Sequence, residues 1–181
     1  MVSGPLTGVG KTTVSNYLAS GLNNNGLKVA LIDCDYHRGD LHKEIKSKNI
    51  KLEDLRVDKF DISDYLVKEG FFFIPRPRNA SETAFNFFQS QEFSLLIDKI
   101  YESVDYIIID TPPLLSRPDA LMISRVSSEI LLVARHAVTT NKEFKESMNQ
   151  LNSVTNKSTY AVYNCLKRNR FNYGYYNYYD Y

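Results

Sequence analysis

A run of ten residues near the start of the sequence has the composition of a phosphate-binding loop and leads directly into a helical pattern. It consists of Gly4, Pro5, Leu6, Thr7, Gly8, Val9, Gly10, Lys11, Thr12 and Thr13. Glycines let backbone N–H groups converge on phosphate oxygens, Lys11 reaches the outer phosphates, and the Thr12 hydroxyl is a ligand for Mg²⁺. Pro5 stands where the strict Walker A pattern has glycine, and Gly4 lies one place earlier. The run predicts a Walker A loop, although alone it also fits a glycine-rich turn that caps an ordinary helix.

Two other segments place carboxylates where apolar strands end. Asp33 and Asp35 follow residues 29–32, and the two-residue period of an extended chain points both the same way, toward the phosphates. Asp110 ends the apolar run 106–109, as the acid of a Walker B segment does, and is the expected carboxylate on the Mg²⁺ side. Either segment alone is more typical of a turn or a helix cap. Together with the loop, they complete the groups that phosphoryl transfer needs.

The histidines and cysteines do not form a metal-binding motif in the sequence. His37, His42 and His136 have no metal-ligand spacing and are predicted to lie at the surface or at the rim of the site. Cys34 and Cys165 form neither a disulfide framework nor a zinc motif, which fits a reducing cytosol.

Alternating strands and helices must position these groups. Short apolar runs predict strands at 28–33, 71–74, 106–110, 130–134 and 159–164, and apolar residues three and four apart predict helices at 12–22, 91–104 and 142–154. This order predicts an α/β fold, with a parallel sheet covered by helices on both faces and the ligand site beyond the carboxyl ends of the strands. Only Met1 and Val2 precede the turn-forming residues 3–5, so we expect a first strand cut short, and a chain that is the distal part of a longer protein.

Composition narrows the class of protein. The chain has 181 residues, a formal net charge of +1 and 43% hydrophobic residues, so it predicts one globular core and gives no reason to expect nucleic acid as a partner. No apolar run approaches the roughly 18 residues that cross a bilayer. The sequence divides into a domain at 1–168 and a tail at 169–181. The tail is rich in tyrosine, with Tyr173, Tyr175, Tyr176, Tyr178, Tyr179 and Tyr181.

Taken together, the motifs resemble the bacterial tyrosine kinase (BY-kinase) family, and most closely the cytoplasmic kinase domain of the Wzc-type polysaccharide co-polymerases. The segment SGPLTGVGKT resembles the family's Walker A motif, LIDCDYHRG its Walker A-prime motif, and DYIIIDTPPLL its Walker B motif. RPDA at 117–120, LLVAR at 131–135 and the terminal tyrosine cluster follow in the family's order. The resemblance covers nearly the whole chain and implies a P-loop NTPase-type fold.

The resemblance also implies an activity and residue roles. The activity is an autokinase that moves the γ-phosphate of ATP, with Mg²⁺, onto the tail tyrosines of a neighbouring subunit in a ring. The catalytic residues would be Lys11, Asp33, Asp35 and Asp110. Asp33 would assist the acceptor, and Thr12, Asp35 and Asp110 would hold the metal, with support from Asp119. Asn164, at the end of the last strand, would contact the base.

Partners and location follow from the same resemblance. They are further copies of the chain in a ring, a cognate tyrosine phosphatase, the polysaccharide export machinery, and the inner membrane through upstream segments, with the domain at its cytoplasmic face. Many family members carry an internal regulatory tyrosine where this sequence has Asp40. We expect phosphates on the tail to repel one another, weaken its docking and favour ring disassembly.

Two alternatives stay open. A MinD- or ParA-like ATPase switch uses the same loop and acids, but such proteins usually have a second lysine early in the loop, and residues 4–9 contain none. The tail could instead be an aromatic interaction segment, or bind RNA together with the basic residues 167–170. Finally, a shortened central strand would anchor the loop weakly, which predicts lower stability than that of a chain extended upstream.

Overall fold

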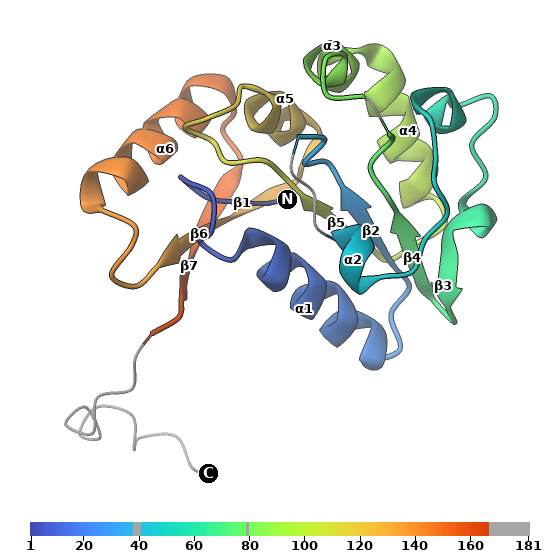
Figure 1. Cartoon of the computed structure of the whole chain (residues 1–181), viewed down its shortest axis with the longest axis horizontal. Helices are drawn as coiled ribbons and strands as arrows, with labels where there is room; N and C mark the ends of the chain where they lie inside the picture. Colours follow the sequence, from blue (N-terminus) through green and yellow to red (C-terminus); the bar gives the residue numbers. More distant parts are fainter. Residues whose placement is uncertain (38–40, 79, 167–181) are drawn as a thin grey trace.

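The computed structural model describes residues 1–37, 41–78 and 80–166, and a seven-stranded sheet runs through the middle of this part (Figure 1). The strand order is β3-β4-β2-β5-β1-β6-β7. The strands are β1 (Val2–Ser3), β2 (Val29–Asp33), β3 (Leu66–Lys68), β4 (Phe71–Ile74), β5 (Tyr106–Asp110), β6 (Glu129–Arg135) and β7 (Ser158–Asn164). All neighbours are parallel except β3, which pairs antiparallel with β4 at one edge. The predicted parallel sheet and its five predicted strands are confirmed.

Helices cover both faces of the sheet, as predicted. Figure 1 shows α1 and α2 on one face and the helices α3 to α6 on the other. The helices are α1 (Lys11–Asn24), α2 (Leu41–Glu44), α3 (Ala84–Gln89), α4 (Gln91–Tyr101), α5 (Asp119–Val126) and α6 (Asn141–Val154), with short 3-10 turns at Leu52–Leu55 and Ile62–Tyr65. The three predicted helices correspond to α1, α4 and α6. Helix α4 ends three residues earlier than predicted, because the chain turns there to enter β5.

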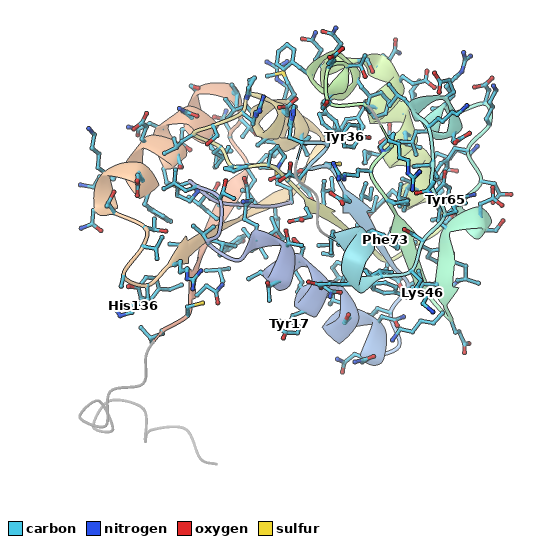
Figure 2. The ribbon with its side chains drawn as sticks, in the orientation of Figure 1. Tyr17, Tyr36, Lys46, Tyr65, Phe73 and His136 are labelled. Carbon is cyan, nitrogen blue, oxygen red and sulfur yellow. The ribbon has the colours of Figure 1, made fainter. Side chains whose placement is uncertain are left out.

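The two faces have separate apolar cores, which follow from the two-residue period of the strands. Along β2, Val29 and Leu31 pack in the core under α1 and α2, while Ala30 and Ile32 pack in the larger core under α3 to α6. Phe73 of β4 belongs to the first of these cores and is almost completely buried (Figure 2). Because every residue of β2 is buried, the strand is held from both sides up to Asp33.

Strand β1 is the shortest of the seven strands and lies inside the sheet, between β5 and β6. Val2 pairs with Asp110 of β5 on one side and with Leu131 of β6 on the other, and Ser3 pairs with Leu132. Ser3 belongs to the strand and not to the turn. That the first strand is cut short stays a prediction. The lower stability expected from this shortness stays a prediction.

The elements that the sequence did not predict are all short. They are the edge strand β3, the short helices α2, α3 and α5, and the 3-10 turns. Six or eight residues are too few for a helical period to stand out in the sequence. Helix α5 nevertheless matters for the site, because its first residue is Asp119.

Candidate active site

The predicted phosphate loop connects β1 to α1 at the carboxyl end of the sheet. Gly8 and Gly10 have φ values of 77° and 97°, in the left-handed region that favours glycine. Gly4 is required for a different reason, since a Cβ there would lie 2.7 Å from both the Val133 carbonyl oxygen and Val9 Cγ2. Close packing against β6 therefore explains why glycine stands at position 4.

Lys11 begins α1 and lies inside the loop. Its side chain is buried, with the residue 6% exposed, and Nζ donates a hydrogen bond to the Leu6 carbonyl oxygen at 3.3 Å. Burial lowers the pKa of Lys11, and the nearby carboxyls of Asp110 and Asp35 partly offset this. The ammonium group is thus held where phosphate oxygens would take over from the Leu6 carbonyl.

Asp110 is fixed by two hydroxyl groups of α1. Thr12 Oγ1 donates to Asp110 Oδ2 at 2.8 Å, and Ser15 Oγ lies 3.0 Å from Oδ1. Burial raises the pKa of Asp110 to about 6, and the hydrogen bonds from Thr12 and Ser15 limit the increase. Ser15 was not among the residues predicted from the sequence. The signal was its position three residues after Thr12, which places both hydroxyls on one face of the helix.

Asp33 lies beside Asp110 but has fewer partners. The two residues are opposite one another in the β2–β5 register. Asp33 Oδ1 accepts the Asp35 N–H at 3.1 Å, whereas the buried Oδ2 accepts no hydrogen bond from the described residues. Burial, reinforced by Asp110, raises the pKa of Asp33 to about 8. A carboxyl in this state exchanges a proton near neutral pH.

Asp35 and Asp119 complete the acidic rim. Asp35 is partly buried, and its Oδ1 accepts the His37 N–H at 3.3 Å. His37 Nε2 lies 3.3 Å from Asp119 Oδ2, so α5 is tied to the turn after β2. His37 lies at the rim, as predicted. The sequence did not foresee its pairing with Asp119, because the two residues are 82 positions apart.

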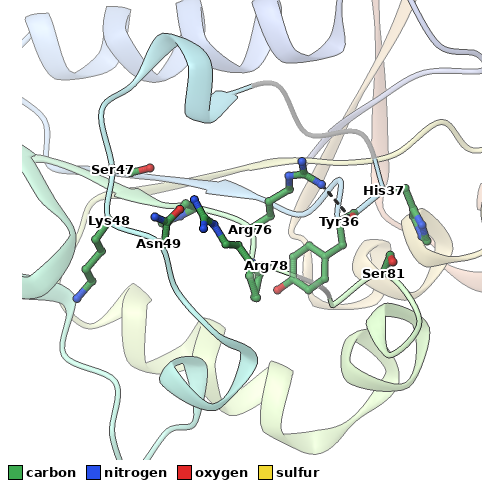
Figure 3. Close-up of a pocket in the computed structure, with 10 residues that line it drawn as sticks. Tyr36, His37, Ser47, Lys48, Asn49, Arg76, Arg78 and Ser81 are labelled. Carbon is green, nitrogen blue, oxygen red and sulfur yellow. Dashed lines mark hydrogen bonds between the residues drawn. The ribbon is translucent and has the colours of Figure 1, made fainter.

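A cavity of about 410 Å³ is lined by residues of the turn after β2 and of the segment that follows β4 (Figure 3). Arg76, just after β4, donates from Nη1 to the Tyr36 carbonyl oxygen at 3.2 Å, and its charge lowers the pKa of Asp33 slightly. The Tyr36 ring packs against Phe88 with ring centroids 4.7 Å apart. The other lining residues are mostly polar or basic: His37, Ser47, Lys48, Asn49, Pro75, Pro77, Arg78 and Ser81.

The last residues of β6 and β7 contact the phosphate loop from the opposite side. Asn164 Nδ2 donates to the Val9 carbonyl oxygen at 3.0 Å, and Arg135 Nη1 donates to the Gly8 carbonyl oxygen at 2.8 Å. The assignment of Asn164 to the nucleotide base stays a prediction. Arg135 was not among the predicted site residues, although the LLVAR segment had been noted.

The donor set fits Mg²⁺ bound together with a nucleotide. Thr12, Asp35 and Asp110 supply hard oxygen ligands, and Mg²⁺ commonly uses few protein ligands, together with water and phosphate. Within residues 1–37, 41–78 and 80–166, no cluster of three or more His, Cys, Asp or Glu side chains forms a cage by itself. The ion would therefore depend on the nucleotide for part of its coordination.

Some predicted residues lie outside the described part of the chain. They are the six tail tyrosines (Tyr173, Tyr175, Tyr176, Tyr178, Tyr179 and Tyr181), together with Asp40 and the side chain of His42. The predicted residues that are described, from Gly4 to Thr13 and at Asp33, Asp35, Asp110 and Asn164, gather at the carboxyl ends of β1, β2, β5 and β7.

Comparisons with known proteins agree with this geometry. A family model described as an AAA domain matches residues 4–161. The chain is 32% identical over 188 residues to the tyrosine-protein kinase wzc of Salmonella typhimurium, covering 100% of this chain and 26% of that protein. It superposes on the kinase domain of the Escherichia coli tyrosine kinase ETK with a TM-score of 0.84 and 29% identity, covering 100% of this chain and 72% of that one. The septum site-determining protein MinD of Pyrococcus horikoshii, solved with Mg-ADP, shares the fold, with a TM-score of 0.68, 21% identity, and 87% and 65% of the two chains covered.

The chain therefore belongs to the AAA domain family and has the P-loop NTPase fold. Within that class, the resemblance to the catalytic domain of bacterial tyrosine kinases is confirmed by the sequence relatives and by the ETK kinase domain. The chain spans about a quarter of the length of the curated relatives it matches, 26% for the Salmonella protein. In its described part, no helix has both the length and the apolar composition needed to cross a membrane.

Proposed function

We propose that this chain is the catalytic part of an ATP-dependent protein-tyrosine autokinase that phosphorylates the C-terminal tyrosines of a neighbouring copy. The acceptors would be Tyr173, Tyr175, Tyr176, Tyr178, Tyr179 and Tyr181. The likeness to the ETK kinase domain supports the reaction class, and the tyrosine-rich tail supplies acceptors on the same chain. The loop from Gly4 to Thr13, with Asn164, would bind Mg-ATP.

The observation that carries the proposal is the state of Asp33. Its buried Oδ2 has no hydrogen-bond donor among the described residues, and its pKa is raised to about 8. A carboxylate in that position can accept the proton of a tyrosine hydroxyl, and a pKa near the working pH suits a general base. An ATP-hydrolysing switch could use the same group to orient water, so the acceptor must be tested directly.

The reaction then follows from the residues in place. The phenol oxygen forms a bond to the γ-phosphorus, the bond from that phosphorus to the β–γ bridging oxygen breaks, ADP departs, and the phenolic proton passes to Asp33. Lys11 and the loop N–H groups stabilise the phosphate charge, and Mg²⁺ held by Thr12, Asp35 and Asp110 would neutralise part of it. We place the acceptor side chain in the cavity lined by Tyr36 and Arg76, because the charge of Arg76 acts on Asp33.

The wider context is part of the same proposal. Relatives with a Wzc-type name suggest a role in the control of capsular or exopolysaccharide polymerisation and export, in a ring of copies at the cytoplasmic face of the bacterial inner membrane. A cognate tyrosine phosphatase would reverse the modification. Phosphates on the tail would repel one another and loosen the ring.

The test is incubation of the protein with Mg²⁺ and ATP, followed by mass spectrometry for phosphotyrosine. Phosphate on the tail that is absent in Lys11→Met and in a tail-deleted protein would establish the autokinase. Release of free phosphate with no phosphotyrosine would instead establish the MinD- or ParA-like ATPase switch, whose fold this chain shares.

A further inference from the structure

Two strands that contribute no Walker residue hold the phosphate loop by its outward-facing carbonyl groups. Arg135 is the last residue of β6 and Asn164 the last of β7, and they are opposite one another in the register of the two strands. Arg135 donates to the carbonyl of Gly8, and Asn164 to the carbonyl of Val9. The two side chains thus form hydrogen bonds to the carbonyl groups of two consecutive residues shortly before Lys11.

This contact bears on phosphate binding because of the geometry of such a loop. N–H groups converge on phosphate oxygens only when the peptide planes are turned so that the N–H groups point inward, which turns carbonyl groups outward. An outward carbonyl without a donor leaves its peptide free to rotate, or leaves a buried polar group unpaired. The donors of Arg135 and Asn164 fix the orientation of these peptides.

The amide of Asn164 is itself tightly placed. Its Oδ1 accepts the Cys165 N–H at 2.8 Å, and the backbone carbonyl of Asn164 accepts the His136 N–H at 2.9 Å. Figure 2 shows His136 at the corner where β6 ends. The Asn164 amide also occupies the space where a Cβ on residue 10 would lie, so Gly10 is glycine both for its φ of 97° and to admit this amide.

We propose that Arg135 and Asn164 are positioning residues that hold the loop in its phosphate-binding conformation, and that Asn164 acts on the phosphate cradle and not on the base. The inference rests on the proposed function only in that the loop binds phosphate. It does not depend on whether tyrosine or water is the acceptor.

The experiment measures equilibrium binding of Mg-ATP, Mg-GTP and inorganic tripolyphosphate to the full chain by calorimetry. A residue that holds the cradle affects all three ligands alike, so Asn164→Ala should weaken each of them by about tenfold. Arg135→Met should weaken all three in parallel, and Arg135→Lys, which keeps a donor, should restore much of the loss. Matched controls are Arg125→Met on α5 and Asn152→Ala on α6, both exposed and remote from the loop.

Two results would overturn the proposal. The first is weaker binding of ATP by Asn164→Ala with tripolyphosphate binding unchanged, which would assign Asn164 to the base. The second is unchanged binding of every ligand by Arg135→Met. Thermal melts of each variant without ligand separate loss of binding from loss of fold, and the Arg135 pair keeps the test decisive if Asn164→Ala unfolds. If all three ligands bind more weakly to the variants, but the wild-type protein makes no phosphotyrosine, the proposed autokinase function is wrong and the positioning role is still established.

Discussion

The ends of β2 and β5 present two buried aspartates at matching positions of neighbouring strands, and they are in different chemical states. Asp110 receives hydroxyl groups from Thr12 and Ser15 on its two oxygens, and its pKa is about 6. Asp33 has one oxygen without a donor among the described residues, and its pKa is about 8. Burial is similar. The difference comes from the charge of Asp110, which raises the pKa of Asp33, and from the two hydroxyl donors and the Lys11 charge, which lower the pKa of Asp110.

This difference suggests a division of labour. A carboxylate held by two hydroxyls is oriented and ionised at neutral pH, which suits a metal-side ligand. A carboxyl with an unpaired oxygen and a raised pKa is suited to moving a proton. The topology creates the contrast, because β1 lies beside β5, and the helix that follows β1 therefore brings its hydroxyls to Asp110 and not to Asp33.

The largest expected effect comes from removing the proton acceptor. Asp33→Asn should lower the rate of tyrosine phosphorylation by about 100-fold or more, because loss of a general base commonly costs that much. Equilibrium binding of Mg-ATP should change little, since the loop and Asp110 are intact. Rates by mass spectrometry and affinities by calorimetry test this, with the exposed Glu146→Gln on α6 as control. A rate close to wild type in Asp33→Asn would remove Asp33 from the chemistry.

The second effect is on stability as a function of pH. The folded protein holds a proton on Asp33 up to about pH 8, whereas an ordinary aspartate has a pKa of 3.8. The folded state therefore binds more protons than the unfolded state between these values, and stability falls as pH rises through that window. Asp33→Asn removes this contribution and should stabilise the ligand-free protein by on the order of 2 kcal/mol at pH 8, and by much less at pH 4.

Urea unfolding of the wild type and Asp33→Asn at several pH values between these limits provides the measurement. Asp110 contributes in the same direction up to about pH 6. Burial lowers the pKa of the N-terminal amino group to about 6, and this group acts in the opposite direction between pH 6 and pH 8. The difference between the wild type and Asp33→Asn therefore isolates Asp33. Parallel curves for the two proteins would show that Asp33 is ionised at neutral pH in the folded state.

The positions of Asp33 and Asp110 could be predicted from the sequence, but the difference between their environments could not. Both acids could be predicted at strand ends, because residues 29–32 and 106–109 are continuous apolar runs of the kind typical of strands in a parallel sheet. Their unequal environments depend on which strand lies next to β1, and strand order is not encoded in any local period. The same limit applies to Arg76 and Arg135, which become site residues only through the neighbours that the sheet gives them.

The role of Ser15 could not be predicted from the local sequence pattern alone. Its spacing from Thr12 was visible in the sequence, yet a serine inside a helix is commonly a small residue at a packed position. Only the approach of α1 to β5 shows that its hydroxyl reaches Asp110. Short elements such as α5 were missed for a related reason, because their ends are set by tertiary contacts such as the one between His37 and Asp119.

The third effect comes from removing a hydroxyl donor from Asp110, which makes its environment more like that of Asp33. Ser15→Ala removes one of the hydroxyls at Asp110 and leaves a buried carboxyl oxygen without that donor, which should destabilise the protein by about 1 kcal/mol or somewhat more. The pKa of Asp110 should rise toward that of Asp33, and Mg²⁺-dependent ATP binding should weaken at pH 6 more than at pH 8. Unfolding free energies and calorimetry at the two pH values test this, with Ser20→Ala in the same helix as control. An equal loss of binding at both pH values would contradict the role assigned to this hydroxyl.

The smallest effect concerns the charge that partly counters the burial of Asp33. Arg76 is the weakest of the influences on this carboxyl, and it acts to lower the pKa. Arg76→Gln should therefore shift the rising limb of the pH–rate profile to higher pH by less than about one unit, with the same rate at the plateau. Arg78→Gln is a useful comparison because Arg78 lines the same cavity but is not among the charges that act on Asp33. A shift to lower pH, or an equal shift in both variants, would mean that Arg76 does not act through the charge of Asp33. A fall in the plateau alone would instead place Arg76 in contact with the acceptor, in the cavity that Arg76 lines.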